Sequence, residues 1–313
     1  IRSAAGYANA PVTVTIPVAV PDGHIAMGVL YDEATGKLEG LPLVDATPTS
    51  VTVGLRTFAP SPSPASSGKR FFSGAETVVS GNLLVVSVAE SVLRSGGVID
   101  TGFKPGVDDW EFVNAGSYIA PGGHCAGQSI SAMWYYYEKK LKGSPSLYGQ
   151  LDRVRDSKYV LWQDNRWGYR FASTVQEDLD WDSLSRKIFL VTRETPEYHH
   201  LSWKAFALSM YLTGEPQYVG LKSDQGGHAI IAHKIDYPNG ILYVSDPNYP
   251  GEEHTITYNG ARFDPYNTMQ NTDEADPHPY TGIGYFAKSS MIDWDRIGQR
   301  WKELENHTIG NDR

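Results

Sequence analysis

The chain has 313 residues with 36 acidic and 27 basic side chains, giving a formal net charge of −9. The length fits two domains or one large one, and the 41% hydrophobic content is enough to build a core. The acidic balance argues against nucleic-acid phosphates as a partner, and no apolar stretch approaches the ~20 residues of a membrane span. One cysteine, Cys125, excludes an internal disulfide and a metal site built from several cysteines.

The first 95 residues are expected to form a small antiparallel β-sandwich that offers no catalytic chemistry. Turn signals at 21–23 and 32–37 separate short alternating strands, and a Pro/Ser-rich stretch at 59–68 is typical of a linker or a long surface loop. The strands are predicted at 12–20, 26–31, 38–44 and 50–58. The apolar run 82–92 either closes the sandwich or begins the next domain, and we place the boundary near Gly96-Gly97.

Residues 96–313 are expected to form an α+β domain in which a helix precedes an antiparallel sheet. Apolar residues at helical spacing predict a helix that begins at Cys125 and ends at Gly143 and Pro145. Asn239-Gly240 is a strong hairpin signal between two strands. The other predicted elements are a helix at 202–212, strands at 217–221, 228–235, 241–245 and 283–287, and a helix at 290–304.

Three local sequences carry candidate chemistry. In the first, Gly122-Gly-His-Cys-Ala-Gly127, the thiol lies at a helix start, where the helix dipole favours a thiolate. Small neighbours would let a substrate backbone approach the sulfur, and backbone N–H groups at the helix start could stabilise an oxyanion.

The second and third local sequences surround His228 and Asp246. His228 follows two glycines and opens an apolar strand, and Asp246 ends the strand that the Asn239-Gly240 turn pairs with it. Counting outward from the turn, the two residues are offset. A bulge, or a longer turn that begins at Asp236, would bring them closer.

The order of a helix-borne Cys followed by His and Asp on consecutive strands resembles the papain-like cysteine peptidase superfamily. The local sequences are most similar to its bacterial members, the bacteriocin-processing peptidases and the papain-fold effector and toxin domains. The resemblance covers residues 100–290. It implies that Cys125 is the nucleophile, His228 the general base and acid, and Asp246 the residue that orients the imidazole. Asn248 is the rival third member, because some members of the superfamily use Asn.

The chain departs from the plant and lysosomal branch of that superfamily in one respect. No Gln lies a few residues before Cys125, where that branch carries its oxyanion donor. Asn114 or the Ser117 hydroxyl could take its place, or the Cys125 backbone N–H could act mostly alone. Gln128, which follows the cysteine, could line the cleft.

Each of these residues also has a structural interpretation. A lone cysteine is often a small buried hydrophobe, and the Asp-Pro-Asn sequence at Asp246 is also good turn chemistry. His124 is expected to shape the rim of the site, because adjacent helix residues do not share a face. No metal-ligand spacing and no cofactor motif is found. The acid clusters at 108–109 and 273–276 are expected to be solvated.

The main hypothesis is an exported cysteine peptidase that hydrolyses peptide or isopeptide bonds of a polypeptide substrate, with no cofactor or metal and most simply as a monomer. The start at Ile1 fits either a trimmed chain or a mature secreted or cell-envelope protein, and the many Tyr, Trp, Gly, Pro and Thr residues favour export. Two alternatives stay open: a non-catalytic binding or adhesion protein on a papain-like scaffold, and a transglutaminase-like acyltransferase. Residues 145–215 are expected to supply specificity.

Overall fold

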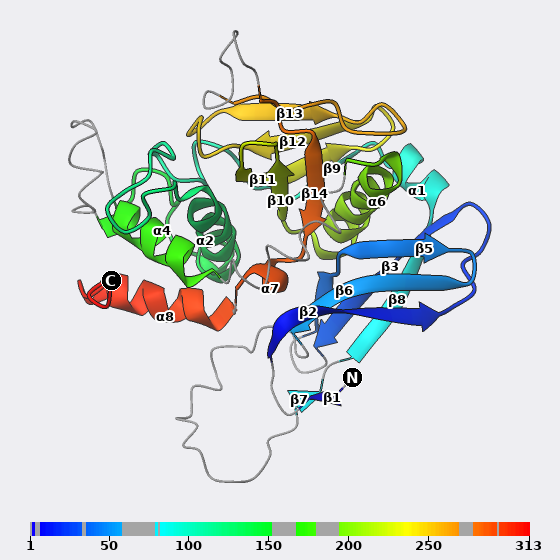
Figure 1. Cartoon of the computed structure of the whole chain (residues 1–313), viewed down its shortest axis with the longest axis horizontal. Coiled ribbons are helices and arrows are strands. Elements are labelled where there is room, and N and C mark those ends of the chain that lie inside the picture. Colours follow the sequence, from blue (N-terminus) through cyan, green and yellow to red (C-terminus); the bar gives the residue numbers. More distant parts are fainter. Residues whose placement is uncertain are drawn as a thin grey trace.

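The computed structural model describes residues 2–3, 7–32, 36–57, 79–80, 82–151, 167–179, 194–268, 278–292 and 294–313. The molecule is an α+β protein in which helices and antiparallel sheets are combined (Figure 1). The Pro/Ser-rich stretch 59–68, the acid cluster 273–276 and parts of the proposed specificity segment (152–166 and 180–193) lie outside the described residues. Among the described helices, none combines the length and apolar composition that a membrane crossing requires.

Two three-stranded antiparallel sheets form the N-terminal region, in the orders β2-β6-β5 and β4-β3-β8. The two sheets pack face to face. Gly28 in one sheet lies so close to Val53 in the other that a Cβ atom added to Gly28 would be 2.6 Å from the Val53 side chain. The strands are β2 (Tyr7–Pro17), β3 (His24–Asp32), β4 (Lys37–Gly40), β5 (Leu43–Thr47), β6 (Ser50–Thr57) and β8 (Asn82–Ala89), and a short pair joins β1 (Arg2–Ser3) to β7 (Val79–Ser80). The N-terminal region therefore consists of two packed antiparallel sheets, referred to here as the sandwich.

The predicted strand at 38–44 is wrong as a single element. The structure divides it at Leu41-Pro42, so that β4 pairs with β3 in one sheet and β5 pairs with β6 in the other. Pro42 has no N–H to give to a ladder, and its carbonyl instead accepts a hydrogen bond from the Gly54 N–H at 2.9 Å. The proline is where the chain changes sheets.

The run at 82–92 closes the sandwich and then leads into the second region. β8 pairs with β3 over its whole length, and α1 (Glu90–Ser95) follows without a break. Gly97, with φ of 73°, turns the chain into β9 (Val98–Asp100), which pairs with β11 of the central sheet. The domain boundary that the sequence predicts near Gly96-Gly97 falls at this turn and stays a prediction.

The central sheet is antiparallel, with the strand order β13-β12-β11-β10-β14 and β9 paired to β11. Its strands are β10 (Gln217–Lys222), β11 (Gly227–Asp236), β12 (Ile241–Ser245), β13 (Glu253–Thr257) and β14 (Gly282–Phe286). Four of these match the predicted strands, and β9 and β13 are additions that the sequence pattern did not indicate.

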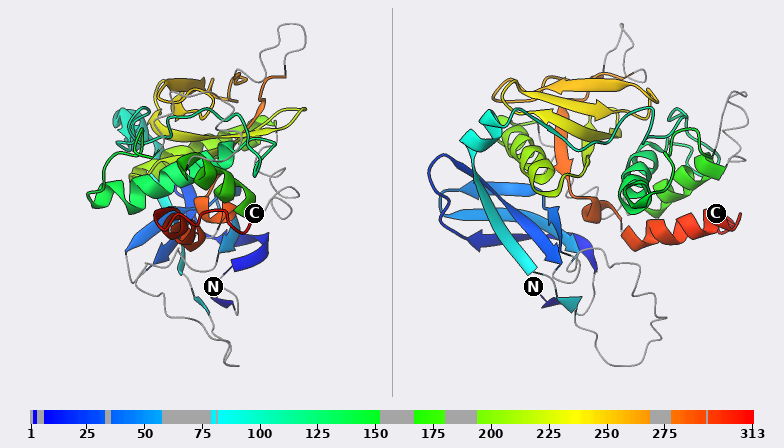
Figure 2. Two further views of the ribbon diagram at one scale, coloured as in Figure 1. Left: turned by 90° about the vertical axis from the view of Figure 1, so that its left-hand side faces the viewer. Right: turned by 180° about the vertical axis from the view of Figure 1, so that it is seen from behind.

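Helices cover both faces of the central sheet, as Figures 1 and 2 show. On one side lie α2 (Cys125–Glu138), the 3-10 turn η2 (Lys140–Lys142), α4 (Trp167–Asp178) and α8 (Trp294–Glu305), and on the other lies α6 (Pro196–Thr213), with the short α7 (Lys288–Met291) between β14 and α8. The predicted helix from Cys125 ends earlier than expected, at Glu138, and Gly143 ends the 3-10 turn instead. The predicted C-terminal helix is divided into α7 and α8.

The sandwich and the central sheet share one hydrophobic core. A single cluster of buried residues runs from the sandwich through α6 to the sheet. At its centre the Tyr285 hydroxyl donates to the Gly40 carbonyl at 2.8 Å and interacts with the Ser209 hydroxyl at 2.8 Å. A side chain at Gly40 would overlap Ser209, so the sandwich meets α6 at the closest approach that a backbone allows. A second cluster joins α2, α4 and α8 to the opposite face of the sheet.

Candidate active site

Helix α2 begins at Cys125, as the sequence predicts. The residues before it turn sharply, with Gly123 at a φ of 104°, and the His124 N–H donates to the Asn114 side-chain oxygen at 2.6 Å. Cys125 is half-buried and packs against the α2–α4–α8 cluster. The thiol thus lies at the positive end of a helix of 14 residues.

The glycines around Cys125 have different functions from those expected. A Cβ atom at Gly127 would overlap the Ala172 carbonyl oxygen and lie 2.7 Å from the Gln176 nitrogen, so this glycine permits α2 and α4 to cross closely. The Gly127 N–H also donates to the Gln176 side-chain oxygen at 2.8 Å. Gly122 is the glycine with open space beside its Cα atom. Open space is therefore found beside Gly122, before the cysteine, but not beside Gly127.

A bulge in β11 brings the histidine and aspartate strands into register. Ala232 pairs with Val244 while Lys234 pairs with Tyr243, which leaves His233 as the extra residue. The turn begins after Asp236, which pairs with Ile241. Both devices that the sequence suggested for correcting the offset are present.

His228 and Asp246 form a buried hydrogen-bonded pair. The distance between His228 Nε2 and Asp246 Oδ1 is 2.7 Å, and both side chains are almost wholly buried. The same Oδ1 accepts the Asn248 backbone N–H at 2.8 Å, and Oδ2 accepts the Tyr266 hydroxyl at 2.9 Å. Burial alone would raise the pKa of Asp246, but the charge of His228 and these hydrogen bonds lower it below its usual value. The carboxylate is therefore ionised at neutral pH.

Cys125 lies close enough to His228 for its charge and a hydrogen bond to act on the imidazole. Nδ1 of His228 is buried and makes no hydrogen bond of ordinary geometry with the described residues, and Nε2 is occupied by Asp246. Burial alone would lower the pKa of His228, but the charges of Asp246 and Cys125 and hydrogen bonds to both raise it to about 10. Nδ1 is thus the nitrogen left for the sulfur, and the imidazolium is the favoured form beside a thiolate.

Asn248, the rival third member, also lies beside the imidazole. Its Nδ2 is 3.4 Å from His228 Nε2 and donates to the Thr268 hydroxyl at 3.0 Å. An amide nitrogen is a donor, so it does not accept the proton that Nε2 gives to Asp246. The shorter contact and the chemistry of the acceptor both favour Asp246 as the orienting residue.

The two side chains suggested as oxyanion donors are engaged elsewhere. The Asn114 side-chain oxygen accepts the His124 N–H, and the Asn114 backbone N–H donates to the Pro247 carbonyl at 3.0 Å. Ser117 is fully buried, donates to the Ser173 hydroxyl at 2.9 Å and accepts the Ala120 N–H. By contrast, the Cys125 backbone N–H has no acceptor among the described residues. Asn114 and Ser117 therefore build the loop before the cysteine.

His124 lies in the core and not at the rim. Its side chain is fully buried against Tyr169, at a ring-centroid distance of 4.4 Å, and against Phe112. Neither ring nitrogen has a hydrogen-bond partner among the described residues, and burial lowers the pKa of His124 to about 3. It is a neutral aromatic residue of the core beside the thiol.

The acid pair at 108–109 is also buried, contrary to expectation. Asp108 pairs with Lys140 and accepts the Lys104 N–H, while Asp109 accepts the N–H groups of Gly106 and Gly251. These carboxylates tie loops together. No group of three or more His, Cys, Asp or Glu side chains in the described part of the chain is arranged to hold a metal ion.

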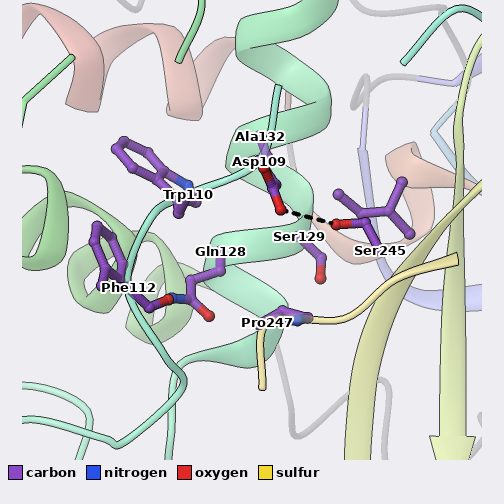
Figure 3. A pocket seen from close by; sticks show the side chains of 9 residues that line it. Asp109, Trp110, Phe112, Gln128, Ser129, Ala132, Ser245 and Pro247 are labelled. Carbon is purple, nitrogen blue, oxygen red and sulfur yellow. Dashed lines mark hydrogen bonds between the residues drawn. The ribbon is translucent and has the colours of Figure 1, made fainter. Parts of the chain in front are cut away.

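A small pocket lies behind Pro247, the residue between Asp246 and Asn248 (Figure 3). Asp109, Ser245 and Gln128 are among its lining residues, and Asp109 Oδ2 accepts the Ser245 hydroxyl at 3.4 Å. Gln128 donates to the Phe112 carbonyl at 2.9 Å, and its own side-chain oxygen is buried with no partner in the described residues. Gln128 therefore faces this inner pocket.

Two tyrosines at the site were missed by sequence reasoning. Tyr266 contacts Asp246, and the Tyr280 ring stacks on His228 with centroids 5.7 Å apart. Both lie in the connection between β13 and β14, and the sequence holds no local signal that folds this connection back over the hairpin. Of the proposed specificity residues that are described, Arg170 bonds the Ile309 and Gly310 carbonyls, and Trp167 stacks on His307.

We compared the chain with family profiles, with curated proteins and with solved structures, and none of the three comparisons finds a match.

Proposed function

We propose that the protein is a cysteine peptidase of papain-like type that acts through Cys125, His228 and Asp246. The observation that carries this proposal is the imidazole with Nε2 held at 2.7 Å by a buried carboxylate and with Nδ1 left for a thiol at a helix start. Among the described residues the core histidine His124 has no hydrogen-bond partner at either ring nitrogen, whereas His228 combines a buried carboxylate with a neighbouring thiol. The pairing favours catalysis over the non-catalytic binding alternative.

The arrangement supports the following chemistry. The Cys125 thiolate attacks the acyl carbon, and the oxyanion that forms accepts the Cys125 backbone N–H. The C–N bond then breaks, the proton on His228 Nδ1 moves to the leaving amine, and a thioester remains. Water attacks the thioester and gives a proton to Nδ1, the C–S bond breaks, and the carboxylic acid leaves. Asp246 keeps Nε2–H oriented throughout and stabilises the imidazolium.

The test is cleavage of a proteome-derived peptide library by the wild-type chain, with Cys125→Ala and His228→Ala as inactive variants and His24→Ala as the matched control. His24 hydrogen-bonds the Asp22 carbonyl in the sandwich, outside the site. Cys125→Ala and His228→Ala are expected to lower turnover by about 10⁴-fold or more, while His24→Ala leaves it unchanged. An active Cys125→Ala enzyme overturns the proposal. Release of ammonia from glutamine with incorporation of an amine would instead identify the acyltransferase alternative.

A further inference from the structure

The connection between β13 and β14 carries two tyrosines to the His228–Asp246 pair. Tyr266 and Tyr280 are joined to each other by two backbone hydrogen bonds, of 3.0 Å and 2.9 Å. The Tyr280 ring lies over the His228 ring at an interplanar angle of 24°, and the Tyr266 hydroxyl contacts Asp246. One backbone bridge therefore fixes both tyrosines relative to the pair.

The two oxygens of Asp246 have unequal sets of donors. Oδ1 accepts His228 Nε2 and the Asn248 backbone N–H, while Oδ2 accepts the Tyr266 hydroxyl and no other donor among the described residues. The Asp246 side chain is wholly buried. A buried carboxylate oxygen without a donor is strongly unfavourable, so Oδ2 depends on Tyr266 for its solvation.

The surroundings of Asp246 hold little other compensating charge. The titratable groups that face it are His228 on β11, Tyr266 and Tyr280 on the β13–β14 connection and, beyond the imidazole, Cys125 on α2, while Tyr249 lies near Tyr266. Within the described residues, His228 is the one ion-pair partner of Asp246. Neutral donors must therefore stabilise the carboxylate whenever His228 gives up its proton.

We propose that Tyr266 is a positioning residue of this site, whose hydroxyl holds Oδ2 so that Oδ1 stays on His228 Nε2. This inference rests on the proposed function. Burial and the neighbouring carboxylate raise the pKa of Tyr266, so its hydroxyl stays a donor over the working range of pH. Without that donor the carboxyl group can rotate about its Cβ–Cγ bond, and its negative charge loses a hydrogen bond.

The loss of this donor has a definite sign in a pH profile. Hydrogen bonds to the ionised form, that from Tyr266 included, help to lower the pKa of Asp246 in the wild-type protein. Removing one of them raises that pKa, so protonation of Asp246 begins at a higher pH. A neutral carboxyl group does not stabilise the imidazolium–thiolate pair. The acid limb of thiolate reactivity should therefore move to higher pH.

The experiment measures the rate of alkylation by iodoacetamide against pH, which requires no known substrate. The full chain is compared as wild type, Tyr266→Phe and the matched control Tyr258→Phe. Tyr258 lies at the start of the same connection, and its hydroxyl contacts the Gly260 carbonyl at 2.9 Å and His200 at 2.7 Å, not Asp246. Tyr266→Phe is expected to slow alkylation about tenfold at pH 5, less at pH 7, and to shift the acid limb upward. Tyr258→Phe should keep the wild-type profile.

A double-mutant cycle separates positioning from a general loss of stability. Because Tyr266 acts through Asp246, adding Tyr266→Phe to Asp246→Asn should change the rate by less than about twofold. A Tyr266→Phe profile equal to that of Tyr258→Phe, or an effect undiminished in the Asp246→Asn background, overturns the inference. His228→Ala decides the underlying function independently: if its profile equals that of the wild type, the proposed thiolate–imidazolium pair is itself wrong.

Discussion

The cysteine and the histidine of the site belong to parts of the molecule that are held by different kinds of contact. His228 and Asp246 lie in a polar network in which Asn248, Tyr266 and Thr268 are also hydrogen-bonded. Cys125 begins a helix whose first turn is held through its backbone, because the His124 and Gly127 N–H groups donate to side chains and α4 packs closely against Gly127. Hydrogen bonds between side chains fix the orientation of a ring or carboxylate, whereas backbone hydrogen bonds and packing fix the position of a helix. Substitutions in each of the two parts test that difference.

The largest effect is expected from Asp246→Asn. The amide leaves the size of the side chain unchanged but removes the charge that stabilises the imidazolium, so turnover of the best library peptide should fall by about 10³–10⁴-fold. Asn248→Ala, which leaves Asp246 in place, should lower turnover of the same peptide by less than about tenfold. Steady-state kcat/KM for both variants provides the measurement. A loss in Asn248→Ala as large as that in Asp246→Asn would assign the orienting function to Asn248 instead.

Gly127→Ala should disrupt the packing of α2 against α4 in the first turn after Cys125. The new methyl group meets the Ala172 carbonyl and the Gln176 backbone, which belong to α4 and cannot rotate away, so we expect a loss of about 3 kcal/mol in the free energy of unfolding. Gly122→Ala is the matched control, because nothing lies within 4 Å of its added Cβ atom. Urea unfolding of both variants measures the difference. Equal stabilities would show that α2 and α4 are not held as closely as described.

His124→Leu removes a buried polar side chain beside Cys125 that has no hydrogen-bond partner among the described residues. The native histidine takes up a proton near pH 3, and the unfolded chain takes one up near 6.5. The unfolded state therefore binds more protons between these values, and wild-type stability falls as the pH drops below ~6.5. His124→Leu should remove about 1.4 kcal/mol of this loss per pH unit. Urea unfolding of both proteins at pH 7 and pH 5 measures this change in stability. If the difference in unfolding free energy between the two proteins is the same at both pH values, the imidazole of His124 is not buried and neutral in the wild-type protein.

The smallest effect is expected from Thr268→Val, which removes the acceptor of the Asn248 side-chain amide. The loss of this hydrogen bond between Asn248 and Thr268 should lower the free energy of unfolding by about 1 kcal/mol. Thr255→Val, on the exposed edge strand β13, is the matched control and should stay within about 0.5 kcal/mol. If both substitutions are silent, Asn248 does not depend on this contact.

Local signals were sufficient for the elements that carry the site. The spacing of apolar residues after Cys125 predicts α2, and the Asn239-Gly240 turn predicts the hairpin of β11 and β12. The break at Pro42 has a local signal as well, since proline cannot donate to a ladder, although the run of apolar residues at 38–44 predicts one strand there. The α+β class follows from these periodicities, while the papain-like assignment stays a prediction.

The remaining features depend on contacts between distant parts of the chain. Nothing near His124 predicts that Phe112 and Tyr169 bury it, and nothing near Gly127 shows that α4 will cross there. The sequence also cannot show that Tyr266 reaches Asp246, because a long connection must first fold back over the hairpin. Small and aromatic residues can have several structural or functional roles, and the residues that they contact in the folded protein decide which role each one has.

The extra residue at His233 makes this hairpin sensitive to insertion and deletion. His228 and Asp246 are 18 positions apart, and the bulge is where the pairing with β12 shifts by one residue. Deleting one residue between them would slide β12 against β11 and turn alternate side chains to the opposite face. Variation in chain length should therefore be accepted in surface turns of the sandwich and rejected between these two residues, so a scan of single-residue deletions would outline the site without any substrate.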